Sequence, residues 1–359
     1  MRVTDAVAAA LGRAPVDPEH LQKLFLWALR CGLVPDLRFE ASPMLATRVL
    51  GLEFPHPVGL AAGIDKDAVA VRGLLALGCA SLEVGTMTLR PQTGNPRPRV
   101  FRLDEDHAAI NRFGFNSRGL DAGLERLAGR AREDGIVGIN LGVNSDSTDR
   151  VSDYAQAVAT AAPRGDYLVV NVSSPNTRGL RDLQGSDFID VLLDRVVAAR
   201  NGAQLRPPLL LKIAPDLARD EVDVLVGSAM RHGIDGMIIG NTTVIRPDGL
   251  VSRHARERGG LSGAPLFALS TRVLAWARLA AGGSLPLVGA GGVRDAETAW
   301  AKIRAGADLV QLYTGQVFAG VGLFRSIHDG LVERVAGAGL EHVSEAVGMD
   351  AEIYAEGGV

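Results

Sequence analysis

Two stretches of the sequence decide the fold: residues 167–174 read YLVVNVSS, and residues 236–242 read GMIIGNT. Each is a short run of apolar, largely β-branched residues that ends in polar ones, and the apolar residues are consecutive rather than alternating. A strand with this pattern is buried on both faces, as in a parallel sheet that is covered by helices. The two stretches therefore predict buried parallel strands.

The same theme recurs outward from these stretches, with apolar runs followed by segments whose apolar residues are three or four positions apart. The eight runs are 58–63, 81–86, 137–142, 168–174, 209–215, 236–242, 286–292 and 309–315. Eight alternations predict an α/β protein with a (β/α)8 TIM barrel over residues 46–359, and a doubly wound open sheet is the alternative. Two insertions, 87–117 and 243–265, interrupt the repeat, and the second reads as a flexible loop.

Composition narrows the possible functions. The net charge of −3 gives no reason to expect nucleic acid as a partner. Two cysteines, Cys31 and Cys79, cannot build a disulfide framework, a zinc cluster or an iron–sulfur site, so we expect no metal. The opening does not resemble a signal peptide, and no run reaches the roughly 18 apolar residues that a spanning helix requires. We therefore expect a protein that is soluble or lies on a membrane surface.

Residues 1–45 do not follow the repeat and predict a small N-terminal helical extension. Residues 20–33, HLQKLFLWALRCGL, place apolar residues along one face of a helix, and a second short helix is expected near 36–45. Such a helix either plugs the bottom of the barrel or faces a membrane, where aromatic residues beside basic ones are favourable. The residues alone favour the plug.

Polar residues stand at the carboxyl ends of nearly all the predicted strands, where barrel enzymes place their sites. They are Lys66, Thr86, Asn140, Asn171, Ser174, Lys212, Asn241 and Thr242. Lys212 lies inside the apolar run LLLKIAP, and burying it is costly without an anionic partner. A single asparagine is more often a structural hydrogen-bonding residue, but the whole set on one rim indicates a site.

Glycine-rich turns follow the last two strands, GAGG at 289–292 and YTG at 313–315. In barrels, turns at these positions often bind a phosphate group at a helix N-terminus. Either turn alone is as well explained by a plain tight turn. The two together predict phosphate binding.

The segment 171–180, NVSSPNTRGL, places the hydroxyl of Ser174 between the amides of Asn171 and Asn176. Side-chain amides both donate and accept hydrogen bonds, which suits a planar heterocycle with alternating C=O and N–H groups. The segment 110–116, INRFGFN, adds two further amides and two aromatic rings. A turn rich in Asn and Ser is the bland alternative.

Ten motifs occur in order along the chain. They read GLAAGIDKD (59–67), LEVGTMTLRPQTGNPRPRVFRL (82–103), INRFGFNSRG (110–119), GINLG (138–142), NVSSPNTRGLRDLQG (171–185), KIAPDL (212–217), GNTTV (240–244), GGLSGAPL (259–266), GAGG (289–292) and IRAGADLVQLYTG (303–315). Together they resemble the class 2, quinone-dependent dihydroorotate dehydrogenases, and the likeness runs from about residue 15 to 350. The resemblance implies FMN as the cofactor and oxidation of dihydroorotate to orotate in pyrimidine biosynthesis.

The resemblance also carries the family's roles onto matching positions. Flavin contacts would come from Ala61, Ala62, Gly63, Lys66, Thr86, Asn140, Asn171, Lys212, Gly240, Gly263, Gly292, Tyr313 and Thr314. Orotate contacts would come from Lys66, Asn111, Arg112, Phe113, Gly114, Phe115, Asn171, Asn176, Asn241 and Thr242. Ser174, where class 1 members have a cysteine, would be the general base, with Thr177 and water as candidates for a proton relay.

The resemblance reverses the interpretation of residues 1–45, because the N-terminal helices of class 2 members form a membrane-facing quinone tunnel. The chain is then expected to be a peripheral protein on the cytoplasmic side of the cell membrane, with a membrane quinone as its electron acceptor. Two positions depart from the family: Gly240 stands where relatives often have Thr, and Val143 where lysine is common. Neither touches Ser174, so these departures concern flavin affinity rather than function.

Three other interpretations fit parts of the sequence. A different FMN barrel is one, such as a 2-hydroxyacid oxidase or a dihydropyrimidine dehydrogenase domain; the former would need a histidine base, and none of the predicted strand ends carries one. A second is a phosphate-binding lyase or isomerase barrel, which would lack bound flavin. A third is a non-catalytic lipid-binding protein, which leaves the two lysines and Ser174 unexplained.

Overall fold

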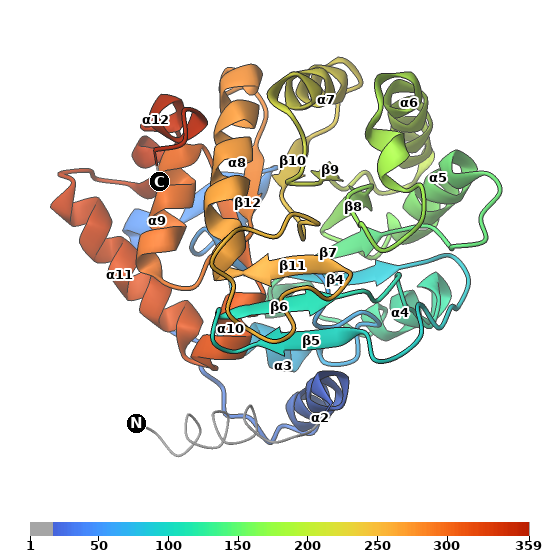
Figure 1. The fold of residues 1–359 in the computed structure, drawn as a ribbon, viewed down its shortest axis with the longest axis horizontal. Helices are drawn as coiled ribbons and strands as arrows, with labels where there is room; N and C mark the ends of the chain where they lie inside the picture. Colours follow the sequence, from blue (N-terminus) through green and yellow to red (C-terminus); the bar gives the residue numbers. More distant parts are fainter. Residues whose placement is uncertain (1–16, 359) are drawn as a thin grey trace.

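Eight parallel strands close into a barrel in the computed structural model, which describes residues 17–358 (Figure 1). In chain order they are β3 (Val58–Leu60), β4 (Ser81–Met87), β7 (Ile136–Leu141), β8 (Tyr167–Asn171), β9 (Leu209–Ile213), β10 (Gly236–Ile239), β12 (Leu287–Ala290) and β13 (Leu309–Leu312). The last strand, β13, pairs with the first, β3, so the barrel has no free edge. The predicted (β/α)8 barrel is confirmed and the open sheet is excluded.

Helices cover the outside of the barrel. They are α3 (Val71–Leu75), α4 (Leu120–Leu127), α5 (Arg150–Ala161), α6 (Ser186–Gly202), α7 (Arg219–Arg231), α8 (Phe267–Ala281), α9 (Ala296–Ala305) and α11 (Leu323–Gly337), with the short α12 (Ala351–Ala355). The short α10 (Thr314–Ala319) lies instead at the carboxyl ends of the strands. Helices α5 and α9 begin on Asp149 and Asp295, whose carboxylates accept backbone N–H groups of the first turn. Every residue of β8, β9 and β10 is buried, as consecutive apolar residues require.

A short hairpin closes the amino-terminal end of the barrel. Strands β1 (Thr47–Val49) and β2 (Leu52–Phe54) pair antiparallel, and Phe54 packs against barrel residues such as Tyr167 and Leu210. The plug expected from the residues alone is therefore this hairpin and not the helix in residues 20–33.

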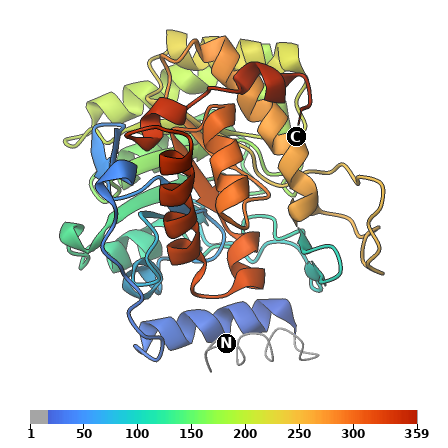
Figure 2. The same ribbon diagram turned by 90° about the vertical axis from the view of Figure 1, so that its left-hand side faces the viewer.

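Helix α2 (Pro18–Arg30) lies at the opposite, carboxyl end of the strands, and Figure 2 shows it as a separate layer beneath the barrel. It begins on Asp17, whose carboxylate accepts the N–H of Glu19 at 2.8 Å. Gln22 fixes it to the barrel by donating to the carbonyls of Gly63 and Ile64, in the loop after β3, at 3.0 and 2.6 Å.

The rest of the N-terminal extension contains less helix than expected. The helix predicted near 36–45 is limited to a 3-10 turn, η1 (Pro43–Leu45), and the preceding residues 35–42 have no helix. Residues 1–16 of the predicted extension lie outside the described residues. Further 3-10 turns are η2 (Arg132–Asp134), η3 (Arg181–Gln184), η4 (Ala264–Leu266) and η5 (Val343–Ala346).

The two insertions join in a small sheet of their own. Strands β5 (Val100–Leu103) and β6 (Ala108–Asn111) form a hairpin, and β11 (Gly260–Gly263) pairs antiparallel with β6. Figure 1 shows the three strands crossing the front of the barrel. The segment 243–265, which was expected to be a flexible loop throughout, thus ends in a strand whose Gly260 pairs with Asn111.

Candidate active site

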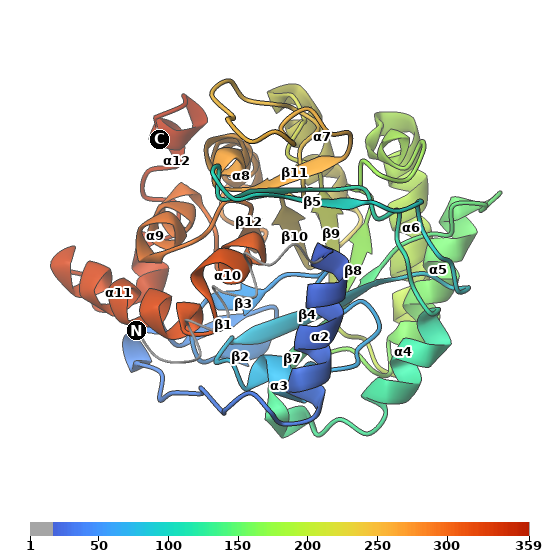
Figure 3. The ribbon, with the colours of Figure 1, turned by 60° about the horizontal axis from the view of Figure 1, so that its bottom comes forward.

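A cavity of about 620 Å³ lies at the carboxyl ends of the barrel strands, between the barrel, α2 and α10. Figure 3 shows these two helices on the same side of the molecule. The polar end of the cavity consists of Lys66, Asn111, Asn171, Ser174, Asn176, Lys212, Asn241 and Thr242. Its apolar mouth consists of Leu21, Leu24, Phe25, Ala28, Leu33 and Val34, with Val317, Phe318 and Val321 opposite. The volume is in the range of small-molecule sites, about 300–1,000 Å³.

All but two of the predicted site residues line this one cavity. Asn140 is fully buried behind the lining. The guanidinium of Arg112 donates instead to Glu257 at 2.9 Å and to the carbonyls of Arg258 and Pro98 at 3.1 and 2.9 Å. The expected contact of Arg112 with orotate therefore has no side-chain support in the structure, because this charge is engaged by the neighbouring loop.

A hydrogen-bond network fixes the side chains beneath the polar end. Asn171 donates to Asn140 Oδ1 at 2.9 Å and to Thr86 Oγ1 at 3.2 Å, and Thr86 donates to Asn140 Oδ1 at 2.6 Å. Tyr154 donates to the carbonyl of Asn171 at 2.6 Å. Three strands and one helix supply these groups, so the amides are satisfied and oriented by the protein itself.

Glu83 is a residue of this network that the sequence analysis missed. Its carboxylate is fully buried in β4 and lies 3.0 Å from Lys212 Nζ. It also accepts from Asn140 Nδ2 at 2.6 Å and from Gln311 Nε2 at 2.8 Å. Glu83 is the anionic partner that a lysine in an apolar strand requires. The signal was present, since a glutamate inside the buried run 81–87 is as unfavourable as a lysine.

Lys66 is the second lysine of the cavity and has a different environment. Its Nζ donates to Asn116 Oδ1 at 2.8 Å and lies 3.1 Å from the centroid of the Phe113 ring. Loss of water around Nζ, and secondly the charge of Arg99, lower the pKa of Lys66 to about 7. A bound anion beside Nζ would supply the counter-charge that the neutral Asn116 lacks, and would raise this pKa.

Ser174 lies at the edge of the cavity, on the loop that follows β8. Its Oγ accepts the N–H of Asn176 at 3.3 Å, and the Asn176 amide donates to the carbonyl of Asn111 at 3.1 Å. Three predicted site residues from two distant segments are thus in contact. The nearby Thr177 Oγ1 is buried and has no hydrogen-bond partner within residues 17–358.

Arg181, which the sequence analysis did not single out, holds this loop in place. It donates to the carbonyls of Ser173 and Thr242, both at 3.0 Å, and pairs with Asp216 at 2.6 Å. Asn241 adds a hydrogen bond to Ser173 Oγ at 2.7 Å. The loops after β8 and β10 are therefore joined beside the hydroxyl of Ser174.

Comparison with known proteins decides the family, since the protein-family model described as dihydroorotate dehydrogenase matches residues 44–335. The chain belongs to the dihydroorotate dehydrogenase family. It is 52% identical over 343 residues to the dihydroorotate dehydrogenase (quinone) of Cereibacter sphaeroides, with 96% of both chains covered. It is 48% identical over 341 residues to that of Bradyrhizobium sp. strain ORS 278, with 94% of this chain and 93% of the relative covered. The predicted resemblance is confirmed.

Solved structures of the family share the fold. The dihydroorotate dehydrogenase of Eimeria tenella in complex with ferulenol matches with a TM-score of 0.90 and 36% identity, covering 94% of this chain and 96% of that one. The ligand-free type from the same organism matches with a TM-score of 0.90 and 37% identity, covering 93% of this chain and 99% of that one. The likeness therefore extends over nearly the whole chain.

The structure describes the surroundings of Gly240 and Val143, the two positions that were expected to depart from the family pattern. Gly240 has a φ of +114°, and a Cβ atom there would lie 2.4 Å from the carbonyl oxygen of Ala290. A side chain at 240 thus requires a different backbone, and only the backbone of Gly240 can reach a ligand. Val143 is buried and does not line the cavity.

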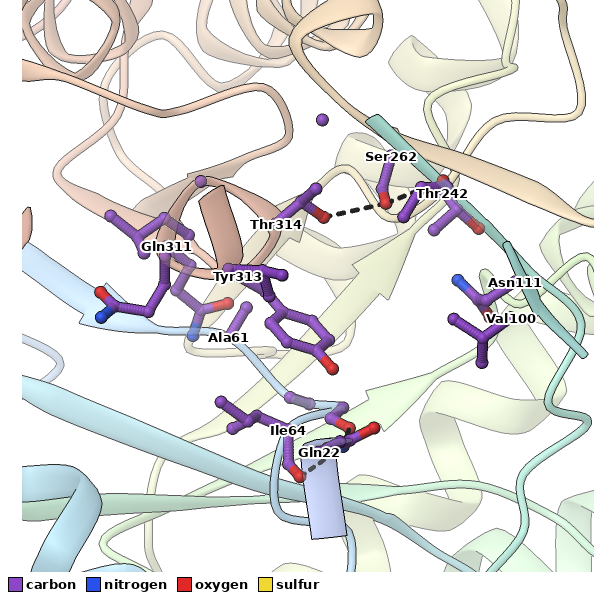
Figure 4. Close-up of a pocket in the computed structure, with 18 of the residues that line it drawn as sticks. Gln22, Ala61, Ile64, Val100, Asn111, Thr242, Ser262, Gln311, Tyr313 and Thr314 are labelled. Carbon is purple, nitrogen blue, oxygen red and sulfur yellow. Dashed lines mark hydrogen bonds between the residues drawn. The ribbon is translucent and has the colours of Figure 1, made fainter. Parts of the chain in front are cut away.

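Tyr313, directly after β13, is one of the predicted residues that line the cavity. Figure 4 shows its ring projecting into the cavity, with the hydroxyl directed between Gln22 and Ile64 on one side and Val100 and Asn111 on the other. Burial raises the pKa of Tyr313, so its hydroxyl stays protonated. Gln22 and Val100 were not predicted, because they come from the N-terminal helix and an insertion.

Proposed function

We propose that this chain oxidises dihydroorotate to orotate in pyrimidine biosynthesis, with FMN as the cofactor and a membrane quinone as the electron acceptor. The observation that carries the proposal is the meeting, in one cavity, of two lysines, a set of amides and the Ser174 hydroxyl. The curated relatives with the quinone-dependent name cover nearly the whole chain, which supports the same activity.

The residues present fit FMN. In the turns after β12 and β13, the backbone N–H groups of Gly291, Gly292, Thr314 and Gly315 have no acceptor within residues 17–358, which suits a phosphate group. Lys212 adds a positive charge to the lining of the same cavity. We assign the flavin contacts to the predicted set, with Asn140 acting through Thr86 and Asn171. When bound, FMN supplies the acceptor for the hydride that leaves the substrate.

The polar end would bind and orient dihydroorotate. The Lys66 ammonium takes the carboxylate, and the amides of Asn111, Asn176 and Asn241 take the C=O and N–H groups of the ring, with the hydroxyl of Thr242 beside them. Groups held in place beforehand by their own hydrogen bonds lose little entropy when the substrate binds. This supports a substrate with one carboxylate and a planar amide ring.

Ser174 is assigned as the base. Dihydroorotate loses a proton from C5 and a hydride from C6, and Ser174 Oγ would receive the proton. A serine hydroxyl is a weak base and must pass the proton on. Thr177 Oγ1, which is buried and finds no hydrogen-bond partner in the described part of the chain, is the candidate for the next group, reached through water.

Residues 1–45 and 46–359 would divide the work between quinone access and flavin chemistry. Helix α2 buries Leu26 and Leu29 against the barrel, whereas Leu24 and Trp27 are 49% and 55% exposed. Exposed apolar and aromatic side chains beside basic ones suit a membrane surface. In the described chain, no helix has the length and apolarity needed to cross a bilayer. We propose a peripheral protein on the cytoplasmic side of the cell membrane.

Flavin colour tests the function directly. The purified protein should be yellow, dihydroorotate should bleach it without oxygen, and a ubiquinone analogue should restore the colour. A colourless protein that fails to bind added FMN would contradict the proposal at its first step. A flavin that dihydroorotate reduces, but that fumarate rather than the quinone reoxidises, would contradict only the choice of acceptor.

A further inference from the structure

Glu19, in the first turn of α2, is buried in a cluster of cations. Its carboxylate accepts Arg99 Nε and Nη2, both at 2.9 Å, and Arg97 Nε and Nη2 at 3.1 and 2.6 Å. Lys23 lies 3.6 Å away. The hydrogen bonds from Arg99, with those from Arg97, lower the pKa of Glu19 to about 2, so it is ionised at every physiological pH. Glu19 and Arg99 are thus a bidentate, buried ion pair between α2 and the residue that precedes β5.

Arg99 extends this contact to the loop that borders the polar end. Its Nη1 donates to the carbonyls of Thr93 and Asn95 at 2.7 and 3.0 Å. Asn95 in turn donates through its backbone to Phe113 O at 2.9 Å and through its side chain to Asn176 O at 3.2 Å. The first turn of α2 is therefore connected to two segments that carry predicted substrate contacts.

The same pair controls charge near Lys66. The Arg99 guanidinium lies 5.5 Å from the Phe113 ring centroid, and Lys66 Nζ lies 3.1 Å from the same centroid. The charged groups that act on Lys66 are Arg99 and Lys23, which oppose its protonation, and Glu19 and Asp67, which favour it. Asn116 adds a neutral hydrogen bond. Removing the Glu19 charge would leave Arg99 uncompensated beside the second cation.

We propose that Glu19 and Arg99 are positioning residues of the polar end: through this ion pair, helix α2 braces the turn at 93–95 against the Phe113 and Asn176 segments and sets the charge that Lys66 presents to an anionic substrate. Helix α2 then contributes to the substrate site as well as to the apolar mouth. The inference rests on the proposed function, because it takes Lys66 to face the carboxylate of orotate.

The test is the pH profile of orotate binding to the full-length, flavin-bound protein. Binding is measured by the change that orotate causes in the flavin absorbance. Wild-type affinity should fall as pH rises above about 7, as Lys66 loses its proton. In Glu19→Gln the fall should begin about one pH unit lower, and in Arg99→Gln it should begin higher. One unit corresponds to about a tenfold change in Kd on the alkaline limb.

Lys23→Gln is the matched control. It removes a contact to the same carboxylate from a solvent-exposed ammonium, whose charge has the smallest effect of the four charged groups that act on Lys66, so its profile should stay near wild type. Opposite shifts in the two variants support the inference, since loosening of the fold alone moves both the same way. Equal shifts, or no shift, overturn the inference, provided that thermal unfolding shows both variants to be folded. If one variant fails to fold, the sign of the other's shift decides. Failure of the wild type to bind orotate would instead remove the proposed function.

Discussion

The polar end and the apolar mouth of the cavity are built in different ways. The polar end stands largely on the carboxyl ends of barrel strands. Buried neighbours behind the lining hold its side chains, as Glu83 holds Lys212 and Asn140 holds Asn171. The mouth is formed by α2 and α10, whose contribution is apolar surface. A hydrogen-bonded site depends on individual atoms, whereas an apolar surface depends on area and tolerates exchange. The effects of substitutions at the two ends should therefore differ, both in magnitude and in the property that changes.

The largest effect is expected at Ser174. Ser174→Ala should reduce turnover by a factor of about 10²–10⁴ while FMN stays bound, because a positioned proton acceptor contributes about that much. Rapid-mixing measurement of flavin reduction by dihydroorotate checks this. Ser284→Ala, beyond the end of α8, is the control and should behave as wild type. A near-normal rate in Ser174→Ala would refute the base assignment.

Glu83→Gln tests whether the polar end depends on a buried charge pair. The substitution leaves the Lys212 ammonium unpaired and should lower the free energy of unfolding by about 3–5 kcal/mol, measured by denaturant titration. Glu53→Gln removes a carboxylate from the exposed pair with Arg48 and should cost about 1 kcal/mol or less. Equal costs at the two positions would contradict the importance given to Glu83.

Lys66 should make substrate binding pH-dependent. The pKa of Lys66 is about 7 in the free protein, and a bound carboxylate raises it. Below pH 7 the lysine is protonated in both states, so orotate affinity is flat. Between the free and bound pKa values binding takes up a proton, and affinity falls by up to about tenfold per pH unit. Lys66→Met should bind weakly at every pH, and a retained slope in that variant would assign the titration to another group.

The mouth should give the smallest effect. Substituting Leu24 and Trp27 together by serine should weaken binding to anionic lipid vesicles and slow quinone reduction severalfold, because apolar area is lost. Flavin reduction by dihydroorotate should not change. Ile353→Ser, at an equally exposed apolar residue on α12, is the control. If flavin reduction falls as much as quinone reduction, the two ends do not act separately.

Deleting residues 1–35 is a less selective test of the same comparison. The deletion removes the apolar face of α2 together with Glu19 and Gln22, which contact the insertion and the end of β3. Both half-reactions should then suffer. Point substitutions on the exposed face of α2 keep these contacts and so isolate the mouth.

Local pattern was sufficient to predict the barrel and most of its rim. Consecutive apolar residues followed by a polar one mark buried strands whose ends face the site, and this placed Asn171, Ser174 and Lys212 correctly on one cavity. The hairpin at 47–54 was missed because its strands have three residues each, too few for a periodic signal. Strand β11 was missed because Gly-Leu-Ser-Gly forms a strand only beside β6.

Long-range partnership explains the remaining gaps. Nothing local shows that Glu83 faces Lys212, which is 129 positions away. The direction of Arg112 depends on Glu257, 145 positions away, and the role of Gln22 depends on carbonyls near residue 63. The family resemblance supplied motif positions but not these pairings.

The small sheet formed by the two insertions bears on how ligands enter and leave. Gly260 pairs with Asn111 of the first insertion, and Thr243 bridges to Leu261 of the second insertion itself. One stem of the second insertion is thus fastened to the first directly, and the other stem is fastened to it through β11. Neither insertion can swing outward alone without breaking backbone hydrogen bonds. We expect gating by one flap with two hinges, in which release of product requires the 87–117 and 243–263 segments to move in concert.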